Sequence, residues 1–264
     1  MGTTKITVRS QGEMEESGKV NWRGDQVSAP SAQGIYQASQ VQLDQLGARR
    51  VVGDRVFRYA KAGGAVTVGE LQRSSLTPDG ENNVTQTTAG HHNIGQKTLN
   101  LYSSGSVGAN AYAEGYVCVV NGTTPGPMYR IKSHADIAAT ATGTLTLYDP
   151  LVTTHTAADE VSVLRNMYLG VSQCLSTGAG PAGVAPVSAT TNDYFWLQTW
   201  GPCSVLGSTG TGVVVEGGIV RAGATGSVQG VIAEAATGAW PSLGWGMYLG
   251  TESQQQTVYL TIAP

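Results

Sequence analysis

The four histidines of the chain are the side chains best suited to metal binding or proton transfer. Two of them, His91 and His92, are adjacent. Neighbouring side chains on a strand point to opposite faces, so these two rings do not converge naturally on one ion. No Cys, Asp or Glu lies within six residues on either side. We therefore expect an exposed pair in a loop, and we predict no metal site.

The other two histidines have carboxylates close by in the sequence. His134 lies two residues before Asp136, and His155 precedes Asp159 and Glu160. Each pair has the groups of an acid–base site. Histidine–carboxylate neighbours are also common on protein surfaces, and we expect these to be surface pairs without a catalytic role.

Motifs that would identify an enzyme are missing from the sequence. It contains no nucleophile elbow, HExxH, CxxC, Walker or EF-hand pattern. The Gly-rich stretch 207–212 leads into Val213–Val215, which we expect to be a strand, whereas a phosphate site needs a helix N-terminus. Carboxylates are sparse after residue 25, which argues against a glycosidase. We predict no enzymatic activity, no catalytic residue and no cofactor.

The three cysteines give no reason to expect disulfide bonds. Cys118, Cys174 and Cys203 are odd in number and far apart. We therefore expect three reduced thiols, most of them buried.

Aromatic residues gather in the run 194–200, next to Asp193. Its alternation is typical of a strand that packs on both sides, and we expect Tyr194, Trp196 and Trp200 to lie in a core or a subunit interface. A sugar-binding surface is the alternative, because aromatic rings stack on sugars. Trp240 and Trp245, in a Gly-rich region, favour that alternative.

Basic residues are concentrated just after residue 48. This run has two interpretations: a grip on an acidic partner through bidentate arginine contacts, or a solvated strand face. It consists of Arg49, Arg50, Arg55, Arg58 and Lys61.

Composition narrows the class of protein further. Charged residues make up only 12% of the chain, about half of the usual 25%, while hydrophobic residues reach 41%. The net charge of −3 gives no reason to expect a nucleic-acid partner. No apolar run is long enough to span a membrane, so we expect no membrane partner.

The elements that position these residues are predicted to be short strands. The 36 glycines are scattered, and turn signals recur about every ten residues, which is typical of a sandwich or barrel. Gly53-Asp54 predicts a hairpin turn within 51–59. The expected strands are 51–59, 63–69, 97–102, 114–120, 128–132, 144–148, 160–164, 194–199, 213–215, 230–233, 247–249 and 257–262.

We therefore predict an all-β fold made of many short strands. Residues 1–46 are polar and Gln-rich and are expected to form an extended N-terminal arm. Two β-rich regions are expected to follow, over residues 47–170 and 171–264.

Several stretches of the chain resemble a family of tailed-phage structural proteins encoded near the major capsid protein. The resemblance covers residues 36–264 in patches. It is carried by Tyr194–Pro202, Val213–Arg221, Gly244–Met247, Val258–Ile262, Leu46–Arg50, Arg58–Gly63 and Leu147–Leu151.

The resemblance implies a capsid decoration (cement) protein on the virion surface, assembled in the host cytoplasm and forming a homo-oligomer, as decoration proteins are often trimers. The implied partner is the major capsid protein. The alternative is a tail or vertex protein that binds host-surface glycans. We expect capsid contacts from Trp22, Arg23, Tyr36, Arg49, Arg50, Arg55 and Arg58, and subunit contacts from Tyr194, Trp196 and Trp200.

Overall fold

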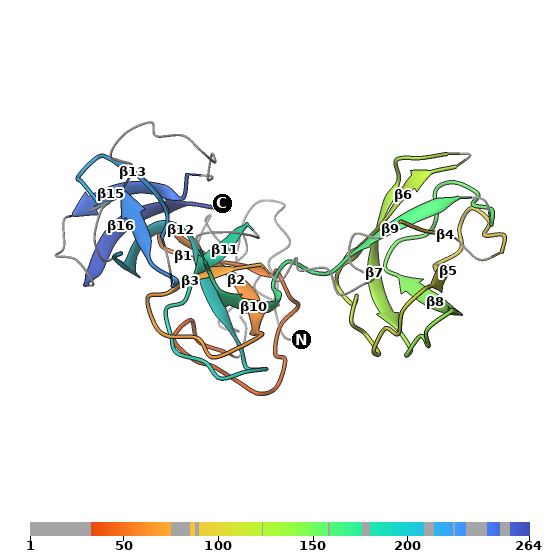
Figure 1. Ribbon diagram of the computed structural model, residues 1–264, viewed down its shortest axis with the longest axis horizontal. Coiled ribbons are helices and arrows are strands. Elements are labelled where there is room, and N and C mark those ends of the chain that lie inside the picture. Colours follow the sequence, from red (N-terminus) through yellow and green to blue (C-terminus); the bar gives the residue numbers. More distant parts are fainter. Residues whose placement is uncertain are drawn as a thin grey trace, which may run out of the picture. The chain divides into compact units, whose positions relative to one another are not determined.

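The computed structural model describes most of the chain beyond residue 32. The described residues are 33–74, 85–87 (backbone only), 90–122, 124–157, 159–175, 180–208, 214–223, 225–230, 242–248 and 254–264. They form strands, turns and loops and contain no helix. The predicted all-β fold is confirmed (Figure 1).

The larger sheet has ten strands, in the order β1-β2-β10-β3-β11-β12-β16-β15-β13-β14. The strands are β1 (Arg49–Val52), β2 (Arg55–Ala62), β3 (Leu71–Arg73), β10 (Leu169–Gln173), β11 (Pro181–Val184), β12 (Tyr194–Leu206), β13 (Ile219–Ala222), β14 (Val228–Gly230), β15 (Gly244–Tyr248) and β16 (Gln255–Thr261).

Part of this sheet closes on itself. β12 pairs with β11 and also with β2, so β2, β10, β3, β11 and β12 form a closed barrel. Closure leaves no free edge along these strands. The second half of β12, from Trp200 onward, pairs with β16. Strands β15, β13 and β14 follow β16 in the sheet and extend it beyond the barrel.

The β1–β2 hairpin is the element that local sequence specifies most directly. Its strands pair from Arg49 opposite Arg58 to Val52 opposite Arg55. Gly53 begins the turn with φ of 63°, the left-handed backbone that the first position of a type II′ turn requires. The predicted hairpin is therefore confirmed.

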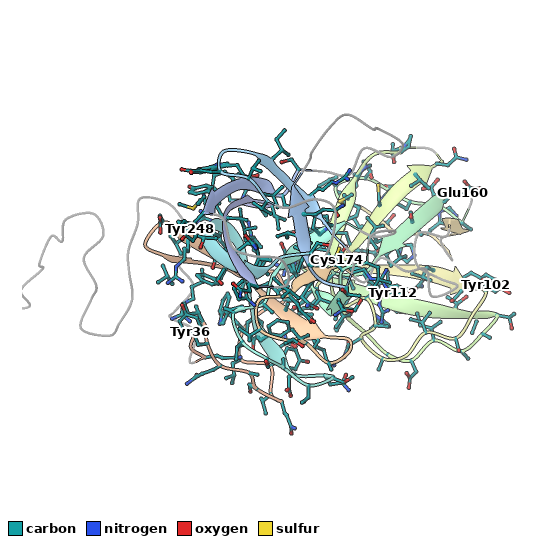
Figure 2. All side chains as sticks on the ribbon, turned by 60° about the vertical axis from the view of Figure 1, so that its left-hand side comes forward. Tyr36, Tyr102, Tyr112, Glu160, Cys174 and Tyr248 are labelled. Atoms are coloured by element: carbon teal, nitrogen blue, oxygen red, sulfur yellow. The ribbon has the colours of Figure 1, made fainter. Side chains whose placement is uncertain are left out.

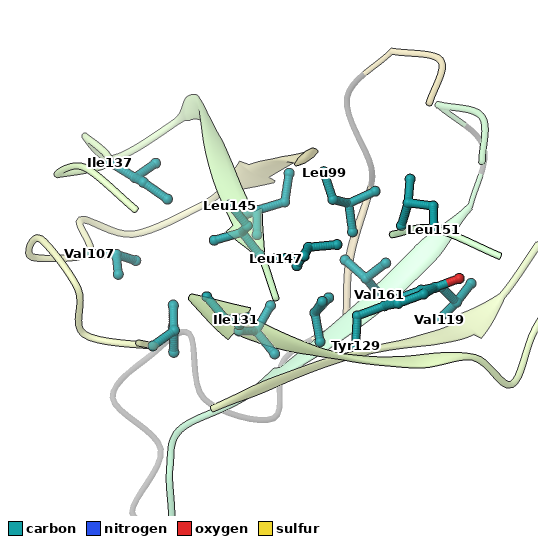
Figure 3. Packing of buried hydrophobic residues seen from close by; sticks show 14 residues of the cluster. Leu99, Val107, Val119, Tyr129, Ile131, Ile137, Leu145, Leu147, Leu151 and Val161 are labelled. Atoms are coloured by element: carbon teal, nitrogen blue, oxygen red, sulfur yellow. The ribbon is translucent and has the colours of Figure 1, made fainter. Parts of the chain in front are cut away.

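The smaller sheet has six strands in the order β4-β9-β6-β7-β8-β5, and it is coloured yellow to green in Figure 1. Its strands enclose one apolar core, with Leu99, Leu145 and Val161 pointing inward from different strands (Figure 3). The strands are β4 (Thr85–Thr87), β5 (Thr98–Ser103), β6 (Tyr116–Asn121), β7 (Met128–His134), β8 (Ala141–Leu147) and β9 (Glu160–Leu164).

The smaller sheet is inserted into the larger one. The chain leaves the larger sheet after β3 and returns in β10, and these two strands are direct neighbours, with Arg73 opposite Ser172 and Gln72 opposite Gln173. The larger sheet thus takes strands from both of the regions expected over 47–170 and 171–264. We refer to β4–β9 as the inserted sheet.

Residues 35–46, expected as part of the extended arm, pack on the larger sheet. Ser39 and Tyr194 exchange two backbone hydrogen bonds, of 2.9 and 2.6 Å. Leu46 is buried against Phe57, Tyr59 and Trp196. The arm expected over residues 1–46 therefore includes, at its end, a segment that packs on β2 and β12.

One kind of tight turn recurs in both sheets. A backbone N–H donates to the side-chain oxygen of the residue three positions later, whose own N–H donates to the carbonyl of the first residue. We call these the side-chain-capped turns. The donor and acceptor residues are Thr67 and Glu70 (3.1 Å), Asn93 and Gln96 (2.7 Å), Thr156 and Asp159 (3.1 Å), and Thr190 and Asp193 (2.8 Å).

These turns are joined in pairs by isolated antiparallel bridges. Val66 pairs with Ala189 in the larger sheet, and His92 pairs with His155 in the inserted sheet. The prediction of a strand over 63–69 is wrong, because only Val66 of this stretch pairs, in the bridge to Ala189. The backbone reverses at Gly69, which has φ of 81°, and Glu70 caps the turn.

Candidate functional site

The basic residues predicted to bind a partner lie together on the β1–β2 hairpin. Arg49 is exposed and lies directly opposite Arg58 in the register. Nη1 of Arg55 donates a hydrogen bond of 3.0 Å to the hydroxyl of Tyr36, whose ring is 59% exposed. The structure thus brings together five of the expected contact residues, which we call the arginine hairpin: Tyr36, Arg49, Arg50, Arg55 and Arg58.

Three members of the arginine hairpin also hold the fold together. The guanidinium of Arg50 lies over the ring of Trp196, 5.6 Å from its centre, in a cation–π contact. Arg58 donates to the carbonyl oxygens of Gly47 (3.3 Å) and Pro264 (2.9 Å). The guanidinium of Arg55 likewise lies 5.5 Å from the centre of the Phe57 ring. Arg49, the one exposed arginine among these four, is therefore the member best placed to meet a partner.

A carboxyl group near the hairpin is held partly out of water. Burial raises the pKa of Asp44, although a hydrogen bond from the Gln45 backbone and the charge of Arg50 oppose this shift. Among the described residues, Arg49 and Arg55 form no ion pair with a carboxylate. At Arg49 and Arg55 the hairpin therefore presents positive charge that no carboxylate of the described residues pairs with.

The structure separates the three aromatic residues expected at a subunit interface. Trp196 is only 1% exposed and meets Tyr59 edge to face at 5.0 Å. Tyr194 is half-buried and stacks on Tyr59, with Lys61 over its ring. These two residues belong to a core cluster under residues 35–48. Of the two predicted positions, core or subunit interface, the structure shows the core for both. Trp200 belongs to a different part of the sheet.

Trp200 contributes to an outward-facing aromatic surface on the C-terminal strands. Tyr259 meets Trp200 edge to face at 6.1 Å and stacks on Trp245 at 5.3 Å with an interplanar angle of 8°. Trp245 is 42% exposed and Tyr248 is 73% exposed. The side chain of Tyr248 is labelled in Figure 2. We call Trp200, Trp245, Tyr248 and Tyr259, with Ile219 opposite Trp245, the C-terminal aromatic face.

Sequence reasoning found only part of this surface. Trp245 was noted for its Gly-rich surroundings, whereas Tyr248 and Tyr259 were overlooked. The alternation of Trp245 with the glycines at 244 and 246 is the signal that could have found the surface, because it predicts a strand with one bare face.

The buried histidines differ from what the sequence led us to expect. His92 is only 4% exposed, so the prediction of an exposed pair is wrong for this residue, while His91 is exposed. Nε2 of His92 accepts a hydrogen bond from the backbone N–H of Asn100. His92 is buried because its backbone pairs with that of His155 in an isolated bridge. The loop-like composition around His92 does not indicate this pairing.

His155 and Asp159 also lie inside the protein. Both side chains are 0% exposed, and Nδ1 of His155 lies 3.2 Å from Oδ2 of Asp159. The expectation of a surface pair is wrong here, because the capped turn folds Asp159 back beneath the His155–His92 bridge. A pair closed off from solvent has no access to a substrate, so its geometry favours a structural role.

The cysteines are free thiols in the structure, as predicted. Burial raises the pKa of Cys203 to about 12 and raises that of Cys174 as well. A thiol nucleophile needs a depressed pKa, so these two residues have the opposite of the required environment.

The described residues contain no group of three or more His, Cys, Asp or Glu side chains that could hold a metal ion. No helix in this part of the chain is long and apolar enough to cross a membrane. Trp22 and Arg23, the remaining expected contact residues, lie outside the described residues.

These features define an all-β protein with a closed barrel, an inserted sheet and two candidate binding surfaces. Comparison of the chain with protein families, with curated proteins and with solved structures gives no match.

Proposed function

We propose that this chain is a capsid decoration (cement) protein of a tailed phage, which binds the outer surface of the major capsid protein lattice as a homotrimer and stabilises the shell. The arginine hairpin is the observation that carries the proposal. The exposed guanidinium of Arg49, with Arg55 on the neighbouring strand, suits bidentate contacts with carboxylates on a partner protein.

The register of the hairpin supports binding to an acidic partner. Arg49 and Arg58 are cross-strand neighbours, and like charges in that position repel each other. A carboxylate from a partner would relieve this repulsion. A trimer would present three such hairpins to a repeating lattice, and linked contacts of this kind raise avidity by about 10² to 10⁴.

Charge reversal on the hairpin tests the proposal. The full-length Arg49→Glu variant and the wild type are titrated onto phage capsids that lack this protein, and bound protein is measured by co-sedimentation. We expect Arg49→Glu to weaken binding about tenfold or more, because like charges would then face each other across the interface.

Lys132→Glu is the matched control, since Lys132 is an exposed strand residue of the inserted sheet and undergoes the same change in charge. It should bind as the wild type does. Equal binding by Arg49→Glu and the wild type would contradict the proposal, as would a copy number in purified virions of only a few per hundred capsid subunits.

The C-terminal aromatic face favours a second candidate function, a tail or vertex protein that binds host-surface glycans. Exposed Trp and Tyr rings next to neutral hydrogen-bonding side chains, such as Thr257 and Gln255, suit sugar recognition. Trp245→Ala should then abolish binding to host-surface polysaccharide, measured on a glycan array, and leave capsid binding intact. Polysaccharide binding that survives Trp245→Ala would exclude this face as the site.

A further inference from the structure

Strand β1 is an uncovered edge of the larger sheet. It ends the strand order, with β2 on one side and no strand of the described residues on the other. Its residues alternate between exposed and half-buried, and Val51 is 50% exposed. An edge of this kind presents backbone N–H and C=O groups with which another chain can pair.

The hairpin register identifies which backbone groups of β1 point away from β2. Val52 directly precedes the two-residue turn, so it forms a hydrogen-bonded pair with the first residue of β2. Hydrogen-bonded and non-hydrogen-bonded pairs alternate along an antiparallel ladder, so every second residue before Val52 bonds to β2. Ala48, which belongs to this series, does accept from the N–H of Tyr59 at 3.1 Å. The N–H and C=O groups of Arg49 and Val51 therefore point outward, into the uncovered edge.

The charges along this edge disfavour pairing with a second copy of β1. Full antiparallel overlap of two such strands pairs Arg49 of one copy with Val51 of the other and places the two Arg50 residues opposite each other. Like charges directly opposite each other destabilise a strand pair. The edge is thus protected against self-association by its own arginines.

An acidic strand meets the opposite situation. Arg49 is exposed, forms no ion pair among the described residues and lies opposite Arg58 in the hairpin. A strand added along the outer edge would place one of its side chains beside Arg49 on the same face of the sheet. A carboxylate at that position would pair with the guanidinium and offset the repulsion between the two arginines.

We propose that the outer edge of β1 takes up an extended acidic segment of a partner protein as an added antiparallel strand. The inference rests on the proposed function, because it specifies how the arginine hairpin holds the capsid protein. Arg49 and Val51 each form a hydrogen-bonded pair with a residue of the added strand. The residue opposite Arg49 is acidic and the residue opposite the exposed Val51 is apolar. Since the strands run in opposite directions, the partner segment reads apolar, any residue, acidic.

A short peptide tests the pairing in the absence of capsids. The probe is acetyl-Thr-Val-Thr-Glu-Thr-amide, added in large excess to the full-length wild type, with amide exchange read by nuclear magnetic resonance. Exchange at Arg49 and Val51 should be fast in the free protein and should slow by about tenfold or more at saturation, because both N–H groups become hydrogen-bonded. Protection of both amides without peptide would show that the edge is already occupied and would overturn the proposal.

Methylated peptides supply the matched controls. The backbone N–H groups of Val and Glu in the probe face β1, whereas that of the Thr between them points away. N-methylation of Val and Glu should therefore abolish the effect on exchange, and N-methylation of the central Thr should preserve it. No slowing by the unmodified peptide, or equal slowing by the two methylated peptides, would contradict strand addition.

Two substitutions of one residue then separate backbone pairing from side-chain contact on capsids. Val51→Pro removes the outward N–H, and the hairpin tolerates this change because that group does not bond to β2. In the co-sedimentation assay, Val51→Pro should weaken capsid binding about tenfold, because a partner carbonyl loses its donor. Val51→Thr is the control, since it keeps the N–H and the β-branched shape, and it should bind as the wild type does. The peptide experiment decides the question if Val51→Pro does not fold.

The variants also distinguish this inference from the proposed function. Loss of capsid binding by Arg49→Glu with wild-type binding by Val51→Pro would leave the capsid role standing and overturn strand addition. Wild-type binding by both variants would overturn both. Slowed exchange with the peptide in a protein that does not bind capsids would contradict the capsid role and retain β1 as an edge that accepts acidic strands.

Discussion

Gln72 presents an unusual balance of burial and hydrogen bonding. Its side chain is fully buried on β3, and neither its amide oxygen nor its amide nitrogen has a hydrogen-bond partner among the described residues. Gln198, which is also buried, donates to the carbonyls of Trp200 (3.1 Å) and Pro202 (2.7 Å). An unsatisfied buried polar group costs about 1–3 kcal/mol. Apolar substitutions of the two residues should therefore change the stability of the protein in opposite directions.

The Gln72→Met variant should therefore stabilise the protein by about 1 kcal/mol, because it retains the volume and removes the unpaired amide. Gln198→Met should destabilise it by about 1–3 kcal/mol, since it leaves two carbonyls without their donor. Urea unfolding followed by tryptophan fluorescence measures both changes. Equal destabilisation by the two substitutions would show that Gln72 has a partner in solution.

At the scale of single elements, local signals predicted some strands and not others. The hairpin around Gly53 and strand β9 could be predicted because turn chemistry and β-branched runs are local properties. Strands β10 and β11 were missed because LGVSQ and PAGV are short and contain Gly or Pro, and their pairing is set by distant strands. For the candidate site, the arginine run was visible in the sequence, whereas the burial of His92 and His155 depends on a bridge between residues far apart in the chain.

The side-chain-capped turns are elements that a substitution can test. Oδ2 of Asp193 accepts from both the N–H (2.8 Å) and the hydroxyl (2.7 Å) of Thr190. Asp193→Ala should lower stability by about 1–3 kcal/mol, because it leaves a backbone N–H unpaired, and Asp193→Asn should lower it by less, because an acceptor oxygen remains. Thermal unfolding measures the difference. If the two variants were equally stable, the acceptor oxygen of the Asp193 side chain would contribute nothing to stability.

At the scale of the whole molecule, pairing between distant segments determines the architecture. The sequence predicted a barrel or sandwich, and the barrel is present. The insertion could not be predicted from composition, because β3 and β10 carry no signal that they are neighbours. Residues 35–46 likewise cover part of the larger sheet, although they are polar like the segment before them.

Truncation separates these two segments. Removal of residues 1–46 should destabilise the protein by about 2–5 kcal/mol more than removal of residues 1–32, because only the longer deletion removes Leu46 and uncovers Trp196. Chemical denaturation of both truncated proteins measures the difference. If both proteins were equally stable, the packing of residues 35–46 would contribute no stability.

The adjacency of β3 and β10 has a practical consequence. The chain departs and returns on neighbouring strands, and such strands lie about 4.8 Å apart. This point in the barrel is therefore a natural splice site, at which any guest module whose own ends lie close together can replace the inserted sheet without altering the strand order of its host. If the chain coats a capsid, one such exchange would display the guest at every copy on the particle, which makes this protein a candidate scaffold for multivalent presentation.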